Sequence, residues 1–132
     1  MSEDLRKHVV YLINRFRSSH DLPPLHLDQH QSELAKKHSE HRVDRMNEVA
    51  KGPLPWHTES HLHGGWSSEN VGHVERPEHE RPYQLAEEIF HDWLEKPTHR
   101  QNILNAKHRV GIDIAHRQAH GKRRVFMTGR FW

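Results

Sequence analysis

An apolar stripe between Pro82 and Pro97 constrains the fold of this chain more than any other segment. The stripe has helical spacing, and its members are Leu85, Ala86, Ile89, Phe90, Trp93 and Leu94. Apolar residues that recur every three or four positions form one face of a helix, which is buried against another element. Pro82 suits a first helical turn, and a helix does not continue through Pro97. The sequence therefore predicts a packed helix between the two prolines.

Two further helices are predicted in the first third of the chain. The first follows the acids Glu3 and Asp4, which suit a helix N-terminus, and its apolar positions are Leu5, Val9, Leu12, Ile13 and Phe16. It ends before the Leu-Pro-Pro-Leu segment at residues 22–25. The second helix begins at Asp28, which forms a capping box with Gln31, and runs to about Met46. Its apolar side carries Leu34, Ala35, His38 and Met46.

The last third of the chain changes to the period of a strand. Val110, Ile112 and Ile114 alternate with polar residues, and Val125, Met127 and Phe131 repeat the alternation after a turn at Gly121. Residues 51–81 are rich in Gly, Pro, Ser and His and predict a long ordered loop or short irregular elements, and residues 98–105 predict a connecting segment. Helices followed by a hairpin favour the α+β class, or equally a layered α-β-α sandwich, in one domain over residues 1–132.

Charge and cysteine content exclude several functional classes. The 20 basic and 18 acidic residues are spread evenly along the chain, so no nucleic-acid-binding stripe is predicted. Residues 122–124 are interpreted as a solvated basic turn. The absence of cysteine excludes disulfides and thiolate chemistry. No transmembrane segment and no signal peptide are predicted, because the chain opens on an amphipathic pattern and has no long apolar run. These features leave the localisation open.

Sixteen histidines are the outlier in the composition. Because imidazole titrates near neutral pH, acidification adds positive charge to a chain whose formal charge is already +2. Mutual repulsion of these charges opposes the compact state. We therefore expect the fold to lose stability below about pH 6.

A series of short motifs runs along the chain in a characteristic order. The segments are Asn14 to Arg17 with Leu22–Leu25 and Asp28, Ala35–Ser39 with Met46, Trp56–Thr58, Ser68–Gly72, Trp93 with Pro97–Leu104, Val110–Asp113, and Val125–Thr128 with Phe131. In order and separation they resemble the CAP superfamily (cysteine-rich secretory, antigen 5 and pathogenesis-related proteins), in particular its small cysteine-free bacterial members. The resemblance covers nearly the whole chain and implies a three-layer α-β-α sandwich with a small antiparallel sheet.

The resemblance also implies a cleft, whose residues here are His57, Glu69 and His99. Two neutral imidazoles suit Zn²⁺ or another divalent transition metal, and an open site leaves positions for water or an anionic ligand. Glu69 would ligate the metal, orient a histidine, or accept a proton from bound water. In the alternative interpretation the three side chains only hydrogen-bond to one another and cross-link the loop to the helices.

One position departs from the family pattern. Larger members carry a second glutamate three residues after the helix tryptophan, and here that position is Lys96. Glu95 precedes it but points about 100° away on a helix, so the resemblance implies a reduced cleft. His61 and His63 are interpreted as solvated loop residues in preference to further metal ligands, and His38 as a packing residue.

Three functions remain open. The first is a non-enzymatic module whose cleft binds a divalent metal and a small ligand. The second is a metal-assisted hydrolase, similar to a peptidase or esterase, with Glu69 as general base; the sequence carries no H-E-x-x-H helix and no G-x-S-x-G elbow. The third is a partner-binding scaffold with a vestigial cleft. Family members are usually secreted and some are associated with lipid or sterol binding, but no residue here specifies a small-molecule, lipid or protein ligand or an oligomeric state.

Overall fold

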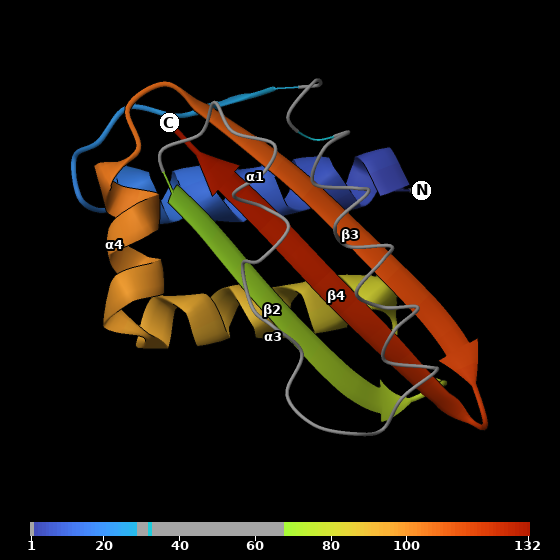
Figure 1. Ribbon diagram of the computed structural model, residues 1–132. Coiled ribbons are helices and arrows are strands. Elements are labelled where there is room, and N and C mark those ends of the chain that lie inside the picture. Colours follow the sequence, from blue (N-terminus) through green and yellow to red (C-terminus); the bar gives the residue numbers. More distant parts are fainter. Residues whose placement is uncertain (1, 29–31, 33–67) are drawn as a thin grey trace.

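The computed structural model describes residues 2–28, 32 and 68–132 of the chain (Figure 1). Its helices are α1 (Ser2–Ser18), α3 (Pro82–Glu95) and α4 (Pro97–Asn105). Its strands are β1 (His26–Leu27), β2 (Ser68–Pro77), β3 (Arg109–Ala119) and β4 (Lys122–Phe131). Within the described ranges no helix has the length and apolar character needed to cross a membrane. Helices packed on one sheet place the chain in the α+β class, as the sequence predicts.

Strands β3 and β4 form the predicted antiparallel hairpin. Its register pairs Ile112 with Gly129 and Ile114 with Met127. His120 and Gly121 form the turn, with φ angles of 55° and 74°, and two-residue turns with two positive φ angles match the twist of a hairpin. The strands extend further toward the turn than predicted, because the residues there are polar and hide the alternation.

The sheet has the strand order β1-β3-β4-β2. Strand β4 pairs antiparallel with both β2 and β3, and the two-residue β1 pairs in parallel with the start of β3. The small antiparallel sheet implied by the resemblance is therefore present, with one short parallel strand added at its edge.

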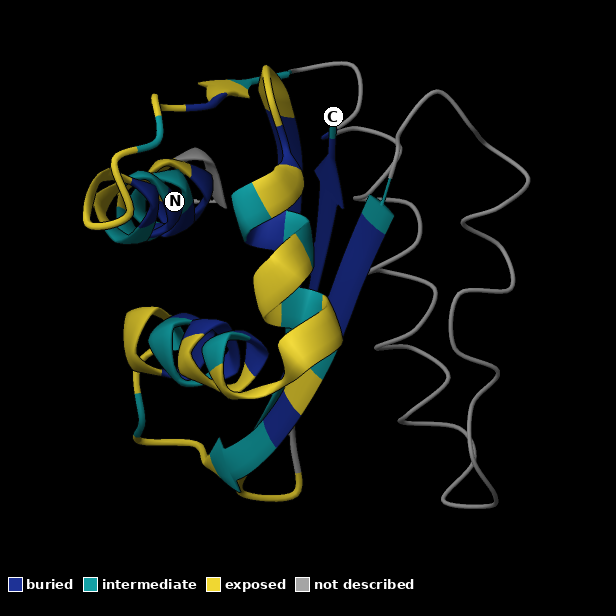
Figure 2. Cartoon of the chain, turned by 90° about the vertical axis from the view of Figure 1, so that its left-hand side faces the viewer, coloured by how far each residue is buried: buried dark blue, intermediate teal, exposed yellow. Residues whose placement is uncertain are grey.

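Helices α1, α3 and α4 lie on one face of the sheet (Figure 2). The strand side chains that pack with them are apolar and buried: Val74, Val110, Ile112, Ile114, Val125, Met127 and Phe131. The helix predicted from Asp28 to Met46 lies outside the described residues except at its start. There the Ser32 amide donates to the carbonyl of Asp28 at 3.0 Å, as in a first helical turn.

Strand β2 lies where the sequence predicts a loop or short irregular elements, so that prediction is wrong for residues 68–77. The positions of β2 that face the helices include Asn70, Gly72 and Val74, and only Val74 has an apolar side chain. Asn70 is fully buried and hydrogen-bonds to α4. A Cβ at Gly72 would lie 2.6 Å from Cγ2 of Ile89, so only glycine lets α3 approach this closely. Two inward positions of β2 are therefore occupied by a hydrogen-bonding residue and by a glycine that makes room for a helix, and β2 shows no hydrophobic alternation.

Helix α4 is the second element that the sequence does not predict. Pro97 occupies its first turn, where the missing N–H costs nothing. Among the nine residues of α4 only Ile103 is buried, so the segment has no apolar stripe from which a helix could be inferred. The connecting segment predicted for residues 98–105 is therefore a helix.

Two polar residues of α1 fix the loops that follow α1 and α4. The Asn14 side chain donates to the carbonyl of Leu25 at 3.1 Å and accepts from its amide at 2.8 Å. The Arg17 guanidinium, which is 1% exposed, donates to the carbonyls of Pro23 at 3.0 Å and of Ile103 and Ala106 at 2.8 Å. One buried cation thus joins the loop before β1 to the C-terminal end of α4, where carbonyls lack helical partners.

His116 on β3 gives the expected acid sensitivity a specific origin. Burial lowers the pKa of its imidazole from 6.5, and the Arg123 and Arg117 guanidinium groups lower it further. The unfolded chain therefore binds more protons once the pH falls through about 6.5, and the free energy of unfolding decreases. We expect a lower urea midpoint near pH 5.5 than near pH 7.5, and a smaller difference in His116→Gln. A midpoint independent of pH over this range would contradict the expectation.

Candidate functional site

The carboxylate of Glu69 is buried on the face of the sheet opposite the helices. Glu69 is the second residue of β2, and its register partner on β4 is Arg130. Arg130 Nε donates to Glu69 Oε2 at 3.0 Å, and the two side chains are 0% and 2% exposed. Burial of either charge alone would be costly, so each group compensates the other. Glu69 is thus part of a buried ion pair.

His99 lies in the first half of α4, and its backbone is joined to β2 by two asparagines. Asn70 Nδ2 donates to the carbonyl of His99 at 3.0 Å. Asn102 Nδ2 donates to Asn70 Oδ1 at 2.9 Å and more weakly to the carbonyl of Glu69 at 3.4 Å. The backbones of Glu69 and His99 are therefore held close together. Because successive strand residues point to opposite faces, Asn70 faces α4 and the Glu69 carboxylate points to the other side of the sheet.

A second buried ion pair accompanies Glu69 and Arg130. Asp113 of β3 has Thr128 as its register partner on β4, and both are buried. Arg6 of α1 donates through Nη2 to Asp113 Oδ1 at 2.9 Å. Two strand carboxylates are therefore each bound by a guanidinium group.

Arg130, Asn70 and Asn102 are structural partners of the site that sequence reasoning missed. Both asparagines lie within the motifs at residues 68–72 and 97–104, but the motifs alone do not say what they contact. The only sequence signal for Arg130 is a charged residue within the apolar alternation of β4.

The third predicted cleft residue, His57, lies outside the described residues, as do His38, His61 and His63. Among residues 2–28, 32 and 68–132, no group of three or more His, Asp or Glu side chains is arranged to hold a metal ion. The structure therefore describes two of the three predicted cleft residues, Glu69 and His99.

Of the two described cleft residues, His99 suits the role of a metal ligand better than Glu69 does. A carboxylate ligand binds a dication through its negative charge, but the Arg130 guanidinium already bonds Glu69 Oε2 and would repel a second cation placed beside it. The ion pair with Arg130 does not involve the imidazole of His99, and an imidazole in its neutral form is a common ligand of Zn²⁺. Glu69 fits a structural role better than direct ligation, and the partner described for it is Arg130 of β4, which the alternative interpretation did not include.

Glu95 lines a surface hollow that lies apart from Glu69 and His99. It is exposed near the end of α3 and lines a hollow of about 610 Å³ between α3 and β2, together with His73, Glu88, His91 and Asp92. Neither Glu69 nor His99 lines this hollow. Lys96, at the position of the family's second glutamate, pairs with Asp92 at 2.9 Å on the surface.

Solved structures share this fold at low sequence identity. The crystal structure of MpPR-1i aligns with a TM-score of 0.66 and 16% identity, over 98% of this chain and 87% of that one. An extracellular protein from Bacillus anthracis that contains an SCP domain aligns with a TM-score of 0.57 and 20% identity, over 98% of this chain and 41% of that one. An outer surface protein of Borrelia burgdorferi aligns with a TM-score of 0.53 and 14% identity, over 99% and 98% of the two chains.

These likenesses show the arrangement of helices and strands, and the sequence match is carried by the family model. No curated protein sequence matches the chain closely enough to count as a relative. The model described as "CAP: Cysteine-rich secretory protein family" matches residues 10–131, a range that includes Asn14, Arg17, Glu69 and His99. The chain therefore belongs to the CAP family.

Proposed function

We propose that this CAP domain is a non-catalytic binding module whose His57 and His99 imidazoles hold a divalent transition metal, with Zn²⁺ the best fit. Two neutral nitrogen ligands leave two positions of a tetrahedral site open to water or to an anionic ligand. The position of His99 supports the proposal, because the Asn70 and Asn102 bonds fix the first half of α4 against β2.

The observation that carries the proposal over the hydrolase alternative is the ion pair of Glu69 with Arg130. A general base must be within reach of the water proton that it removes. The Oε2 atom of Glu69 instead accepts from Arg130 at 3.0 Å inside a pair that is almost completely buried. In this proposal Glu69 therefore stabilises the start of β2 and performs no proton transfer.

Calorimetric titration of Zn²⁺ into metal-stripped protein at about pH 7.5 tests the proposal. We expect one tight site in the wild type and at least about a tenfold loss of affinity in His57→Ala/His99→Ala. Glu69→Gln should bind Zn²⁺ within about threefold of the wild type, because in this proposal Glu69 neither ligates the metal nor supports a ligand; loss of a supporting residue would cost about 10- to 100-fold. Circular dichroism of each variant checks that it is folded at the titration temperature.

The exposed pair His79 and His91 supplies the matched control for a chain with sixteen histidines. His79→Ala/His91→Ala removes the same number of imidazoles and should leave the tight site unchanged. Several weak sites that are insensitive to His57→Ala/His99→Ala would contradict the proposal and favour a partner-binding scaffold with a vestigial cleft. Turnover of a peptide or ester panel that Glu69→Gln abolishes would instead establish the hydrolase.

A further inference from the structure

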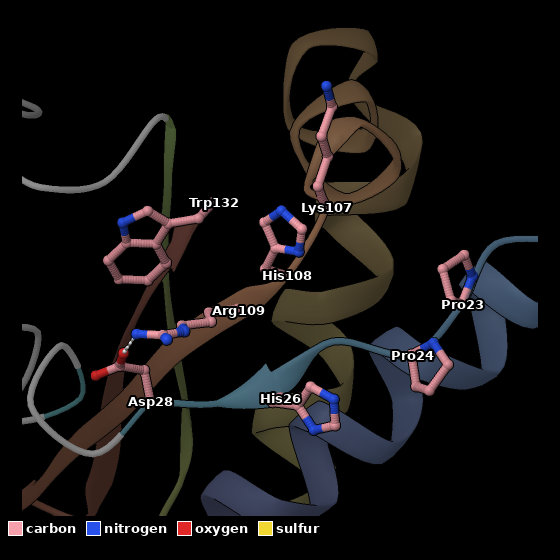
Figure 3. Close-up of a pocket in the computed structure, with 8 residues that line it drawn as sticks. All are labelled: Pro23, Pro24, His26, Asp28, Lys107, His108, Arg109 and Trp132. Carbon is pink, nitrogen blue, oxygen red and sulfur yellow. Dashed lines mark hydrogen bonds and ion pairs between the residues drawn. The ribbon is translucent and has the colours of Figure 1, made fainter.

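A cavity of about 830 Å³ lies at the end of the sheet where β1 and β3 begin (Figure 3). Its walls come from the loop between α1 and β1, from residues 107–109 before and at the start of β3, and from Trp132 after β4. Neither Glu69 nor His99 lines it. The cavity is therefore a separate candidate site, and its size lies within the range of pockets that bind small molecules, about 300–1,000 Å³.

Backbone hydrogen bonds hold the walls of this cavity together. The amides of Lys107 and His108 donate to the carbonyl of Trp132 at 2.6 and 2.9 Å, and the Trp132 amide donates to the carbonyl of Arg109 at 3.0 Å. The His26 amide donates to the carbonyl of His108 at 3.0 Å. Chain segments that are distant in sequence are thereby fixed around the cavity before any ligand enters.

Hydrogen bonds of Arg17 join two walls of the same cavity. Its guanidinium binds the carbonyl of Pro23 on one wall and that of Ala106 beside the opposite wall. Because the arginine is buried and its bonds reach both loops, the separation of the walls is set by the packed core. A site on fixed walls loses little conformational entropy when it binds a ligand.

Positive charge dominates the polar lining. Lys107 and Arg109 carry permanent charges, and among the described lining residues the single acid is Asp28. Asp28 pairs with Arg109 at 3.3 Å, and the Arg109 side chain remains 65% exposed. In Figure 3 the Arg109 side chain extends between Asp28 and Trp132, and the Lys107 side chain points away from both of them. The two cations against one acid favour an anionic ligand over a cationic one.

Flat apolar groups supply the rest of the lining. The indole of Trp132 lies beside the Arg109 side chain, and the rings of Pro23 and Pro24 lie across the cavity from it (Figure 3). Tryptophan and proline rings offer rigid apolar surfaces, and a ring beside a guanidinium suits a ligand with a planar apolar part and a negative group.

We propose that this cavity binds a small organic anion in which a carboxylate is joined to a planar apolar group. Arg109 pairs with the carboxylate, Lys107 adds positive charge to the surroundings of the cavity, and the Trp132 indole contacts the ring. Asp28 competes with the ligand for Arg109, so it weakens binding and helps to set the preference.

Titration of 2-naphthoate, followed by the NMR shifts of the residue 107–109 amides and of the Trp132 indole N–H, tests this site. The uncharged 2-naphthalenemethanol has a ring of the same size, and acetate has the charge without the ring. We expect saturable binding of 2-naphthoate and at least about tenfold weaker binding of each of the other two. Equal shifts with 2-naphthalenemethanol, or no saturable shift with 2-naphthoate, would overturn the proposal.

Two variants that should change the affinity for 2-naphthoate in opposite directions test the roles of the charges. Lys107→Gln/Arg109→Gln should weaken 2-naphthoate binding at least about tenfold. Asp28→Asn should strengthen it severalfold, because asparagine has nearly the same size and removes the competing charge. Lys122→Gln/Arg123→Gln, at the far end of the hairpin, removes two cations outside the cavity and is the control. The proposal fails if this control weakens binding as much as the variant in the cavity, or if Asp28→Asn weakens it.

Discussion

Replacement of Trp93 with alanine should lower the free energy of unfolding by about 3–5 kcal/mol. Among the described residues Trp93 has the largest fully buried side chain, and it is 0% exposed. Its indole N–H donates to the carbonyl of Val71 on β2 at 3.1 Å. The substitution therefore removes a large apolar volume and leaves a buried carbonyl of an edge strand without its partner.

The sheet beneath Trp93 is shaped to receive it. A Cβ at Gly72 of β2 would lie 3.0 Å from the Trp93 indole nitrogen, and a Cβ at Gly129 of β4 would lie 3.1 Å from Cη2 of the same ring. Because glycine has no side chain that could move into a gap, Gly72 and Gly129 cannot help to fill the cavity left by Trp93→Ala. The loss should therefore lie toward the upper end of the range.

Urea unfolding followed by far-UV circular dichroism measures the loss. Tyr83→Ala on the same helix is the matched control: Tyr83 is 37% exposed, and its replacement should cost no more than about 1 kcal/mol. Trp93→Phe keeps most of the apolar volume and loses the N–H, so it should fall between the two. A loss below about 1 kcal/mol for Trp93→Ala would show that α3 does not pack on the sheet through this residue.

The sequence predicts the elements whose apolar periods are uninterrupted. The stripe between Pro82 and Pro97 predicts α3 within one residue of its observed ends, and the alternation at Val110 and Val125 predicts the hairpin. In these elements the residues that face the core are apolar because most of their contacts are with other apolar groups. Local sequence is then sufficient.

The sequence does not predict a strand where an inward-facing residue is required by a contact with a distant segment of the chain. Asn70 is buried because of α4, which lies about thirty residues further along, and Gly72 is required by α3. Both needs are tertiary, so neither leaves a period in β2. The motif Ser68–Gly72 nevertheless marks these positions as specific, and the family resemblance recovers from them what hydrophobic periodicity does not.

The candidate site shows the same difference between what the sequence predicts and what depends on tertiary contacts. Glu69 and His99 are identified from their motifs, but the partner of Glu69 depends on the register of β2 with β4, which places Arg130 directly opposite. A shift of one residue would move Arg130 to the other face. Sequence motifs therefore indicate which residues are special, and the strand register determines whether a carboxylate is open to a ligand or held by an arginine.

Replacement of Arg17 with methionine should cost about 3 kcal/mol or more, a loss comparable with that of Trp93→Ala. Hydrogen bonds to charged groups contribute about 1.5–3 kcal/mol each, and this guanidinium donates to four carbonyls, those of Pro23, Ile103, Leu104 and Ala106. Methionine keeps the packing of the aliphatic part of the arginine and removes the guanidinium, so the loss reports mainly the polar contacts. Buried carbonyls at the end of α4 would be left without a donor.

Arg15→Met on the same helix is the control, because Arg15 is exposed and its replacement should change the free energy of unfolding by less than about 0.5 kcal/mol. Arg17→Lys keeps the charge but not the planar fork that reaches both loops, so we expect an intermediate loss in urea unfolding. Because the fork also fixes the two walls of the cavity beside Trp132, folded Arg17→Lys protein should bind 2-naphthoate more weakly than wild type. Equal losses for Arg17→Met and Arg15→Met would show that the two loops are held without this arginine.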